Sequence, residues 1–215
     1  QTYYLGAPDQ KFKGTIEKFG YTLLGWSGNK KAKTAGYSAN SAVKDAFIKK
    51  IHNKFSGKLS LYAVWTPAVI KITFNGNGAD TNTFKVQKFK YGNKNQKFTG
   101  SISRTGYDFS GWAFNKSAAA GKYKKNANVS NNWIGNVNKL YGTSATLYAI
   151  WKPHVITVRY DGNGADVNTF RAQQFTYGVS GQKAEGTISR EGYKFLGWAL
   201  TKNSKEAKYN PNFNT

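Results

Sequence analysis

The sequence contains no cysteine and no methionine, and only 4 of its 215 residues are proline. The absence of cysteine excludes a disulfide framework and thiolate metal sites, and it fits an exported bacterial protein. The first residue is Gln1 rather than methionine, so we expect a processed or excised chain. No apolar run reaches the roughly 18 residues that a membrane-spanning helix needs, so we expect no membrane insertion.

Acidic residues are also scarce. The chain has 10 Asp and Glu against 32 Lys and Arg, which gives a formal net charge of +22. A surface with this balance attracts polyanions, but the same charge also fits a solvated surface that keeps the protein soluble. Most of the cations are lysines, which bind polyanions by charge rather than by bidentate readout. Teichoic acids, glycosaminoglycans and extracellular DNA all remain candidate partners.

One internal repeat organises the whole chain. The stretch RTGYDFSGWAF at Arg104 has counterparts at Lys18 and Arg190, and Trp26, Trp112 and Trp198 are each 86 residues apart. LYAVW and LYAIW are separated by the same interval, and no gap is needed anywhere. Self-similarity at a fixed period is the signature of a repeat protein. We call the three segments the first, second and third copies.

The period predicts three units. Residues 1–67 form a unit without its first strand, residues 68–153 a complete unit, and residues 154–215 a unit without its closing helix and strand. We expect this segment to be part of a longer array. The joints TPAV and KPHV, residues 66–69 and 152–155, contain prolines that restrict the backbone and predict stiff connections between neighbouring repeats.

Periodicity within each unit predicts an α+β fold. The β-branched run VIKITFN, the turn GNGAD and the alternating TFKVQKFKYG predict a strand, turn and strand that form a hairpin. GYDFSGWAF predicts a strand interrupted by the glycine before the tryptophan, and LYAIW predicts a closing strand. Apolar residues four apart predict helices near 42–54 and 128–140, laid on a sheet of about four strands. Phe47 and Trp133 occupy equivalent helix positions, which indicates that the six tryptophans fill the core.

Three basic positions recur in every copy and predict a stripe along the stacked units. The candidate polyanion-binding residues are Lys11, Lys18, Lys30, Lys97, Arg104, Lys116, Lys183, Arg190 and Lys202.

Catalytic, cofactor and metal sites are not expected. His52 and His154 do not recur in other copies, and no Ser-His-Asp or metal-ligand spacing occurs. The turns NGNGAD and DGNGAD lack the Lys-Ser/Thr of a phosphate loop and the carboxylates of a calcium loop, so a hairpin turn explains them.

The turn DGNGAD, a basic residue before GYxFxGW, and the closing LYAxW together resemble the internalin B-repeat, also called the Listeria–Bacteroides repeat. The resemblance extends over all three copies. It implies a β-grasp-like module that occurs in tandem on secreted and cell-wall-attached bacterial proteins, as a stalk or as a binding unit of adhesins, without enzymatic activity.

These observations predict a spacer and adhesive segment of a bacterial surface or secreted protein, extracellular and attached to the cell wall, with a basic face for polyanions. The alternatives are a self-assembling extracellular fibre built from repeats, since unpaired strand edges invite further pairing, and a module that binds nucleic acid or glycans.

Overall fold

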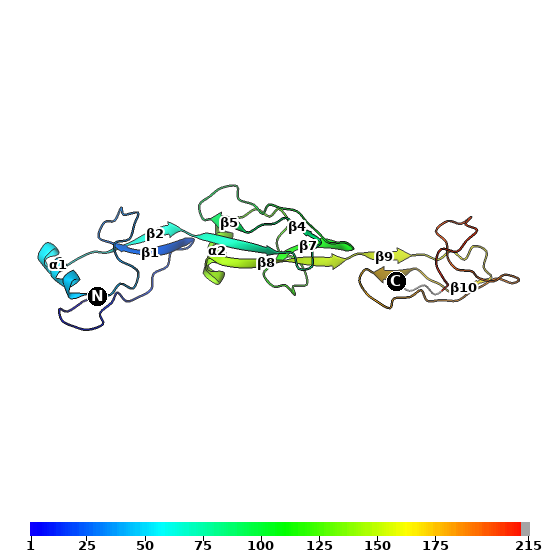
Figure 1. Ribbon diagram of the computed structural model, residues 1–215, viewed down its shortest axis with the longest axis horizontal. Helices are drawn as coiled ribbons and strands as arrows, with labels where there is room; N and C mark the ends of the chain where they lie inside the picture. The colour runs from blue at the N-terminus through cyan, green and yellow to red at the C-terminus, as the bar shows by residue number, and fades with distance from the viewer. Residues whose placement is uncertain (212–215) are drawn as a thin grey trace.

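The structure is a computed structural model that describes residues 1–211, and it is an elongated rod in which the copies follow one another in sequence order (Figure 1). Strands and two helices make it a mixed α+β fold. The first copy contains β1 (Tyr21–Ser27), α1 (Asp45–Phe55) and β2 (Tyr62–Pro67). The second contains β3 (Val69–Asn75), β4 (Thr81–Asn82), β5 (Gln87–Lys90), β6 (Ile102–Ser103), β7 (Tyr107–Ala113), α2 (Asn131–Tyr141) and β8 (Ser144–Pro153). The third contains β9 (Val155–Val158), β10 (Val167–Asn168), β11 (Gln173–Thr176) and β12 (Ile188–Ser189).

The second copy has a four-stranded sheet in the order β5-β3-β8-β7. β3 and β8, the first and last strands of the unit, are parallel neighbours, and the other two pairs are antiparallel. A parallel connection needs a long crossover, and α2 lies in that crossover and packs on β3 and β8. The expected mixed sheet of about four strands with one helix is therefore present in this copy.

The core lies between this sheet and α2. Alternate residues of β3 point inward because successive side chains of a strand face opposite sides, and Trp112 on β7 is fully buried among them. The buried cluster also draws on α2 and β8, and it consists of Ile70, Ile72, Phe74, Phe84, Phe89, Phe98, Ile102, Trp112, Val129, Ile134, Val137, Leu147 and Ala149. Trp133 and Trp151 pack against it and are half-buried, as are Trp26, Trp65 and Trp198 in the other copies.

The glycine before each strand tryptophan interrupts pairing, as the sequence predicts. The register of β7 against β8 shifts between Phe109 and Gly111. Gly111 has φ +141°, and a Cβ there would lie 2.8 Å from the Tyr123 carbonyl oxygen. Only glycine fits such a bulge comfortably. Beyond it, Trp112 and Tyr123 exchange backbone hydrogen bonds of 2.7 and 3.0 Å, which hold the following loop against the strand.

The helices occur where the apolar spacing places them but begin three residues later. In α2 the Ser130 side chain caps the helix by accepting a hydrogen bond of 3.1 Å from the Trp133 amide. A serine at this position favours a helix start, and Val129, which lies within the predicted range 128–140, is buried just before the cap.

The predicted hairpin needs correction. The alternating segment after the GNGAD turn is not one strand running back along β3. Of that segment only β5 pairs with β3, antiparallel and with Ile72 opposite Gln87, whereas Thr81–Asn82, which precede the segment, pair with β6. The connection between the paired strands thus spans residues 76–86 rather than a tight turn.

The outer copies hold two halves of the same sheet. β1 and β2 form a two-stranded sheet that corresponds to β7 and β8, and β9 and β11 form one that corresponds to β3 and β5. The expectation of about four strands in every unit is therefore met in the second copy alone among the described residues.

Each joint is a single extended residue held from both sides. The Ala68 amide donates to the Gly20 carbonyl at 2.9 Å, and the Ala68 carbonyl accepts from the Tyr91 amide at 2.9 Å. His154 occupies the same position in the second joint, where it donates to Gly106 at 2.8 Å and accepts from Tyr177 at 2.9 Å. The extended backbone therefore passes from one repeat into the next with its hydrogen bonds satisfied.

Candidate polyanion-binding surface

One of the three basic positions is built on a tight turn that stacks its cation on a ring. In the second copy the Tyr107 amide donates to the Arg104 carbonyl at 3.1 Å, and Gly106 between them has φ +75°. A turn with positive φ at its third residue requires glycine there and brings its first and fourth residues together. The Arg104 guanidinium carbon consequently lies 4.0 Å from the Tyr107 ring centroid.

The other copies repeat this geometry. The Lys18 ammonium lies 4.1 Å from the centroid of Tyr21, and the Arg190 guanidinium lies 4.2 Å from that of Tyr193. A cation over an aromatic face is stabilised by the ring quadrupole. The repeat thus presents one oriented cation per copy.

A carboxylate lies beside the same turn. Asp80 accepts hydrogen bonds from the Thr105 amide at 2.6 Å and the Thr105 hydroxyl at 2.7 Å. These two bonds, with a smaller contribution from nearby Arg104, hold the pKa of Asp80 below its ordinary value. Asp166 accepts from the Glu191 amide at 2.6 Å in the third copy. Because these carboxylates offset part of the neighbouring charge, Arg104 and Arg190 are weaker anion sites than their exposure alone suggests.

The second recurring basic position, Lys116 in the second copy, is held near Arg104 by an asparagine side chain. The Asn77 side chain donates to the carbonyls of Ala149 at 2.9 Å and Lys116 at 3.4 Å. Gly78 follows it and lies under Arg104, since a Cβ there would come within 3.3 Å of the guanidinium carbon. Arg104 and Lys116 therefore flank the turn that contains Asn77 and Gly78. In the third copy, the Asn163 side chain links to Lys202 in the same way.

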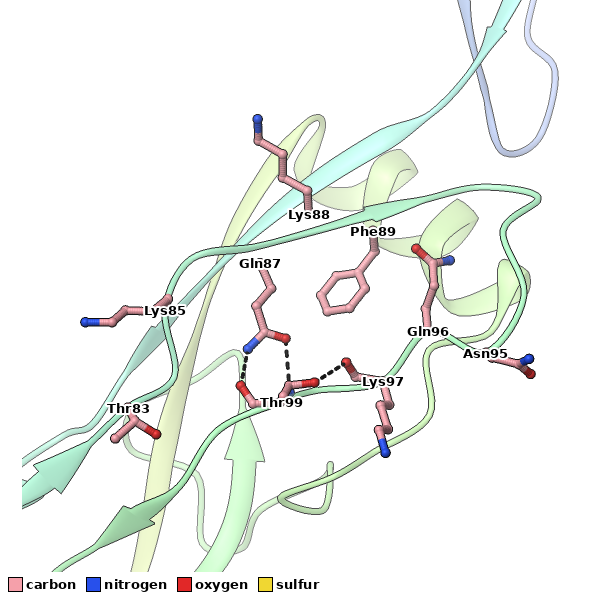
Figure 2. Close-up of a pocket in the computed structure, with 9 residues that line it drawn as sticks. All are labelled: Thr83, Lys85, Gln87, Lys88, Phe89, Asn95, Gln96, Lys97 and Thr99. Carbon is pink, nitrogen blue, oxygen red and sulfur yellow. Dashed lines mark hydrogen bonds between the residues drawn. The ribbon is translucent and has the colours of Figure 1, made fainter.

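The remaining position belongs to another neighbourhood. Lys97 lies opposite Asn128, as Lys11 lies opposite Ala42. It lines an open hollow of about 530 Å³ together with Lys85 and Lys88. Figure 2 shows the three lysines projecting from the rim in different directions. Lys183 and Lys30, the other members of the predicted set, are exposed.

Glutamine side chains hold the walls of this hollow together. Gln87 donates to the Thr99 carbonyl at 2.6 Å and accepts from the Thr99 amide at 3.1 Å (Figure 2). Gln96 does the same with the Lys90 carbonyl and amide, at 2.9 and 2.8 Å. Each glutamine side chain thus both donates to and accepts from one backbone residue, as a neighbouring strand would. It bridges two segments that are too far apart to form a strand ladder.

A further basic site lies on the outer face of the β3–β5 pair. Lys71 and Lys88 are directly opposite each other, and Lys90 lies opposite Val69 in the same register. Like charges at directly opposed positions destabilise a sheet. Among residues 1–211 the salt bridge found joins His154 and Asp108, and no lysine or arginine takes part in one. The repulsion between Lys71 and Lys88 is therefore not relieved by a carboxylate.

This site was missed by the sequence analysis, which sought basic residues recurring in every copy. Lys71 and Lys88 correspond to Thr157 and Gln174 in the third copy, so they are specific to the second. The available signal was the larger basic excess of residues 68–153, with 13 Lys and Arg against 2 Asp and Glu.

Within residues 1–211 there is no group of three or more His, Cys, Asp or Glu positioned to hold a metal ion. Over the same range, no helix has the length and apolar character to cross a membrane.

Taken together, the 86-residue period, the α+β unit and the recurring joints define a tandem-repeat protein. The sequence profile of the Listeria–Bacteroides repeat domain matches residues 71–150 and again 157–215. The chain belongs to this family of repeats of bacterial surface proteins. Residues 1–70 lie outside the matched ranges, although they carry GYTLLGW and LYAVW.

A curated relative is described as a putative Gly-rich membrane protein of Evansella cellulosilytica. It is 29% identical over 114 residues, which cover 52% of this chain and 13% of the relative. The match thus spans about an eighth of that protein's length. No solved structure matches the chain.

Proposed function

We propose that this chain is a stiff spacer of an extracellular, cell-wall-attached bacterial protein, composed of units 1–67, 68–153 and 154–215, each β-grasp-like. The observation that carries the spacer role is the extended backbone that runs through Ala68 and His154, hydrogen-bonded on both sides. The parallel pairing of β3 and β8 around α2 supports the β-grasp-like layout. The family's occurrence on bacterial surface proteins supports the location. A spacer role requires no catalytic groups.

Small-angle scattering tests the spacer. A rod with fixed joints gives a cross-sectional regime and a maximum dimension that stay constant with temperature below the melting transition. A scattering profile typical of beads on a flexible string would contradict the proposal. Limited proteolysis adds a second measurement, because an ordered joint residue resists cleavage. Cleavage concentrated at residues 67–69 and 153–155 would contradict fixed joints.

A second candidate function is adhesion to polyanions, and the unrelieved Lys71–Lys88 pair favours it. A polyanion laid across this face would replace repulsion with attraction. The recurring cations on their tyrosines extend the charge along the rod, so glycosaminoglycan, teichoic acid and extracellular DNA are the proposed partners. A solvated face without a ligand is the alternative.

Salt titration of binding distinguishes these alternatives. Affinity for heparin, lipoteichoic acid and duplex DNA should fall steeply with salt, because binding releases counterions. Reversing Lys97, Arg104 and Lys116 to glutamate should weaken binding to all three polyanions with little change in melting. Lys97 and Lys116 are exposed, and the stacking of the half-buried Arg104 on Tyr107 contributes only about 0.5–1 kcal/mol. Retention of wild-type affinity in that variant, or no binding at low ionic strength, would leave the charge as a solvated surface.

A further inference from the structure

Three aromatic rings of the second copy form a stack that leads from the core to the surface. Phe114, directly after β7, is nearly parallel to Trp133 on α2 and to Tyr141 at the end of the same helix. The centroid distances are 6.5 Å to Trp133 and 4.6 Å to Tyr141, and the interplanar angles are 18° and 24°. Offset stacking of this kind is a favoured arrangement of aromatic pairs. Phe114 thus joins the outermost ring to one that packs against the core.

The inner end of the stack is fixed, and the outer end is exposed. Trp133 packs against Phe98 and Phe89 of the core, at centroid distances of 5.6 and 6.0 Å. Tyr141 is 46% exposed, and because Phe114 covers one face of its ring, much of the exposed surface belongs to the other face. The second copy therefore presents a preorganised aromatic surface, which binds a ligand with little loss of conformational entropy.

Folding of the repeat does not require this stack. In the first copy Gly28 stands at the position of Phe114, and Lys54 stands at that of Leu140, beside Tyr141. Leu140 is 73% exposed, so it adds apolar surface next to the ring without filling the core. Neighbouring exposed apolar side chains of this kind mark binding sites. The stack is thus a feature of the second copy that core packing does not explain.

The surroundings of the stack are basic and lack carboxylates. Residues 109–160 contain no Asp or Glu. The Lys122 ammonium lies 5.9 Å from the centroid of Tyr123, and the Tyr123 ring packs edge-on against Phe114 at 5.9 Å. Lys139 precedes Tyr141 by two residues and is exposed. Charge complementarity therefore favours an anionic ligand at this surface.

The stack also lies close to the strand that carries the opposed lysines. The Lys71 amide donates to the Thr143 carbonyl at 2.8 Å. Thr143 follows Tyr141 by two residues, so their Cα atoms are at most about 7.6 Å apart. Lys71 in turn lies opposite Lys88. The basic pair and the stack are therefore at the same end of the repeat, within the span of one extended polymer.

We infer that the Tyr141 ring is a base-stacking site, which makes single-stranded nucleic acid the preferred polyanion of the second copy. Such a strand combines a backbone that lysines attract with planar bases that stack on aromatic rings. Sulfated glycans and teichoic acids carry the charge without a planar group, and duplex DNA already stacks its bases inside. A neutral glycan also stacks on rings but gains nothing from the lysines. This inference rests on the proposed adhesion to polyanions and names the class of polyanion.

Fluorescence anisotropy with labelled oligonucleotides tests the site in the 215-residue chain. One probe is an oligothymidylate, and the other is an abasic oligomer of the same length, which keeps the phosphates and lacks the bases. We expect the oligothymidylate to bind about tenfold more tightly, the order of effect that stacking of one base gives. Heparin serves as a polyanion without planar groups.

Two substitutions at Tyr141 separate the ring from the fold. Tyr141→Leu keeps an apolar side chain against Phe114 but removes the ring, so it should abolish the preference for oligothymidylate and leave affinity for heparin and the abasic oligomer unchanged. Because no charge is altered, the slope of log affinity against log salt should stay the same. Tyr141→Phe keeps the ring and should bind as the wild type does. Phe55→Leu, at the equivalent position of the first copy, is the matched control, because Gly28 replaces Phe114 there.

The possible failures are distinguishable. Equal affinity for the two oligomers, or equal loss of oligothymidylate binding in Tyr141→Leu and Phe55→Leu, would overturn the base-stacking site and leave adhesion to polyanions intact. No binding of any polyanion at low ionic strength would contradict adhesion itself, together with the inference that rests on it. Binding of a neutral oligosaccharide that Tyr141→Leu abolishes, with unchanged affinity for oligothymidylate, would identify a sugar platform instead.

Discussion

The ring of Tyr91, in the second repeat, lies directly on the backbone of Gly20, in the first. A Cβ added to Gly20 would come within 2.1 Å of the ring. Tyr21 and Phe19 flank the same ring at centroid distances of 5.4 and 6.1 Å. Tyr177 lies on Gly106 in the same way at the next joint. The joint is thus a ring seated on a glycine, and the glycine serves both the turn and the contact.

Gly20→Ala should loosen the first joint. Both Gly20 and Gly192 have left-handed backbone, with φ +76° and +74°, but nothing lies within 4 Å of a Cβ at Gly192. Gly192→Ala is therefore the matched control, expected to show only the backbone penalty of about 1–2 kcal/mol. Gly20→Ala should also displace Tyr91 and increase bending between the first two units. Scattering and thermal melting measure both effects, and identical behaviour of the two variants would contradict the ring-on-glycine joint.

Trp112→Ala should unfold the second unit. The side chain is fully buried against Phe74, Phe84 and Phe109, and truncation of a large buried aromatic costs about 3–5 kcal/mol. Trp198→Ala should cost less, since that ring is only half-buried. Chemical denaturation monitored by tryptophan fluorescence would show the difference. A Trp112→Ala protein with the wild-type transition would contradict the core assignment.

Asp80 should titrate below its ordinary value. Its pKa is lowered first by the Thr105 hydroxyl and then by the Thr105 amide, with Arg104 as a smaller cause. Because the folded pKa is the lower one, the associated stability is present above 3.8, the ordinary value, and is lost as pH falls through the folded pKa. Thr105→Ala removes the hydroxyl but keeps the amide, so the pKa should move part of the way back. A carboxyl NMR titration measures this shift, and an unchanged Asp80 pKa would contradict the assigned cause.

The double variant Lys71→Thr and Lys88→Gln places the residues of the third copy on the second. Removing two opposed like charges should leave the melting temperature equal or slightly higher. The slope of log affinity for duplex DNA against log salt should become shallower by about two ion equivalents. Lys122→Gln with Lys125→Gln is the control for net charge. If both double variants change the slope equally, binding depends on total charge rather than on the paired lysines.

Sequence patterns located the helices and the interrupted tryptophan strand because these depend on residues within each copy. The apolar stripe found α2, while Ser130 set its first residue. Gly111 signalled the bulge because no other residue fits there. Neither feature needs information from a distant part of the chain.

Strand length was less predictable because it depends on a partner. VITVRYD and VIKITFN have nearly the same pattern, yet β9 is four residues long and β3 is seven, because β3 has β8 beside it. The Lys71–Lys88 site was not predicted for a related reason. The two lysines are neighbours only in the observed register of β3 against β5, and the connection formed by residues 76–86 sets that register. Of the nine predicted cations, Lys18, Arg104 and Arg190 are positioned by tight turns. The sequence could indicate these three, because a basic residue recurs shortly before Gly-Tyr in every copy.

The parallel pairing of β3 with β8 also determines how the second repeat would respond to mechanical tension. The chain enters the unit along β3 and leaves it along β8, and the two strands are neighbours running in the same direction. Tension applied at the two ends therefore pulls them past each other along their length. The five residue pairs from Lys71–Ser144 to Asn75–Tyr148 would be loaded together in shear, rather than opened one at a time as in a zipper. A repeat of this topology would resist extension until the whole ladder ruptures.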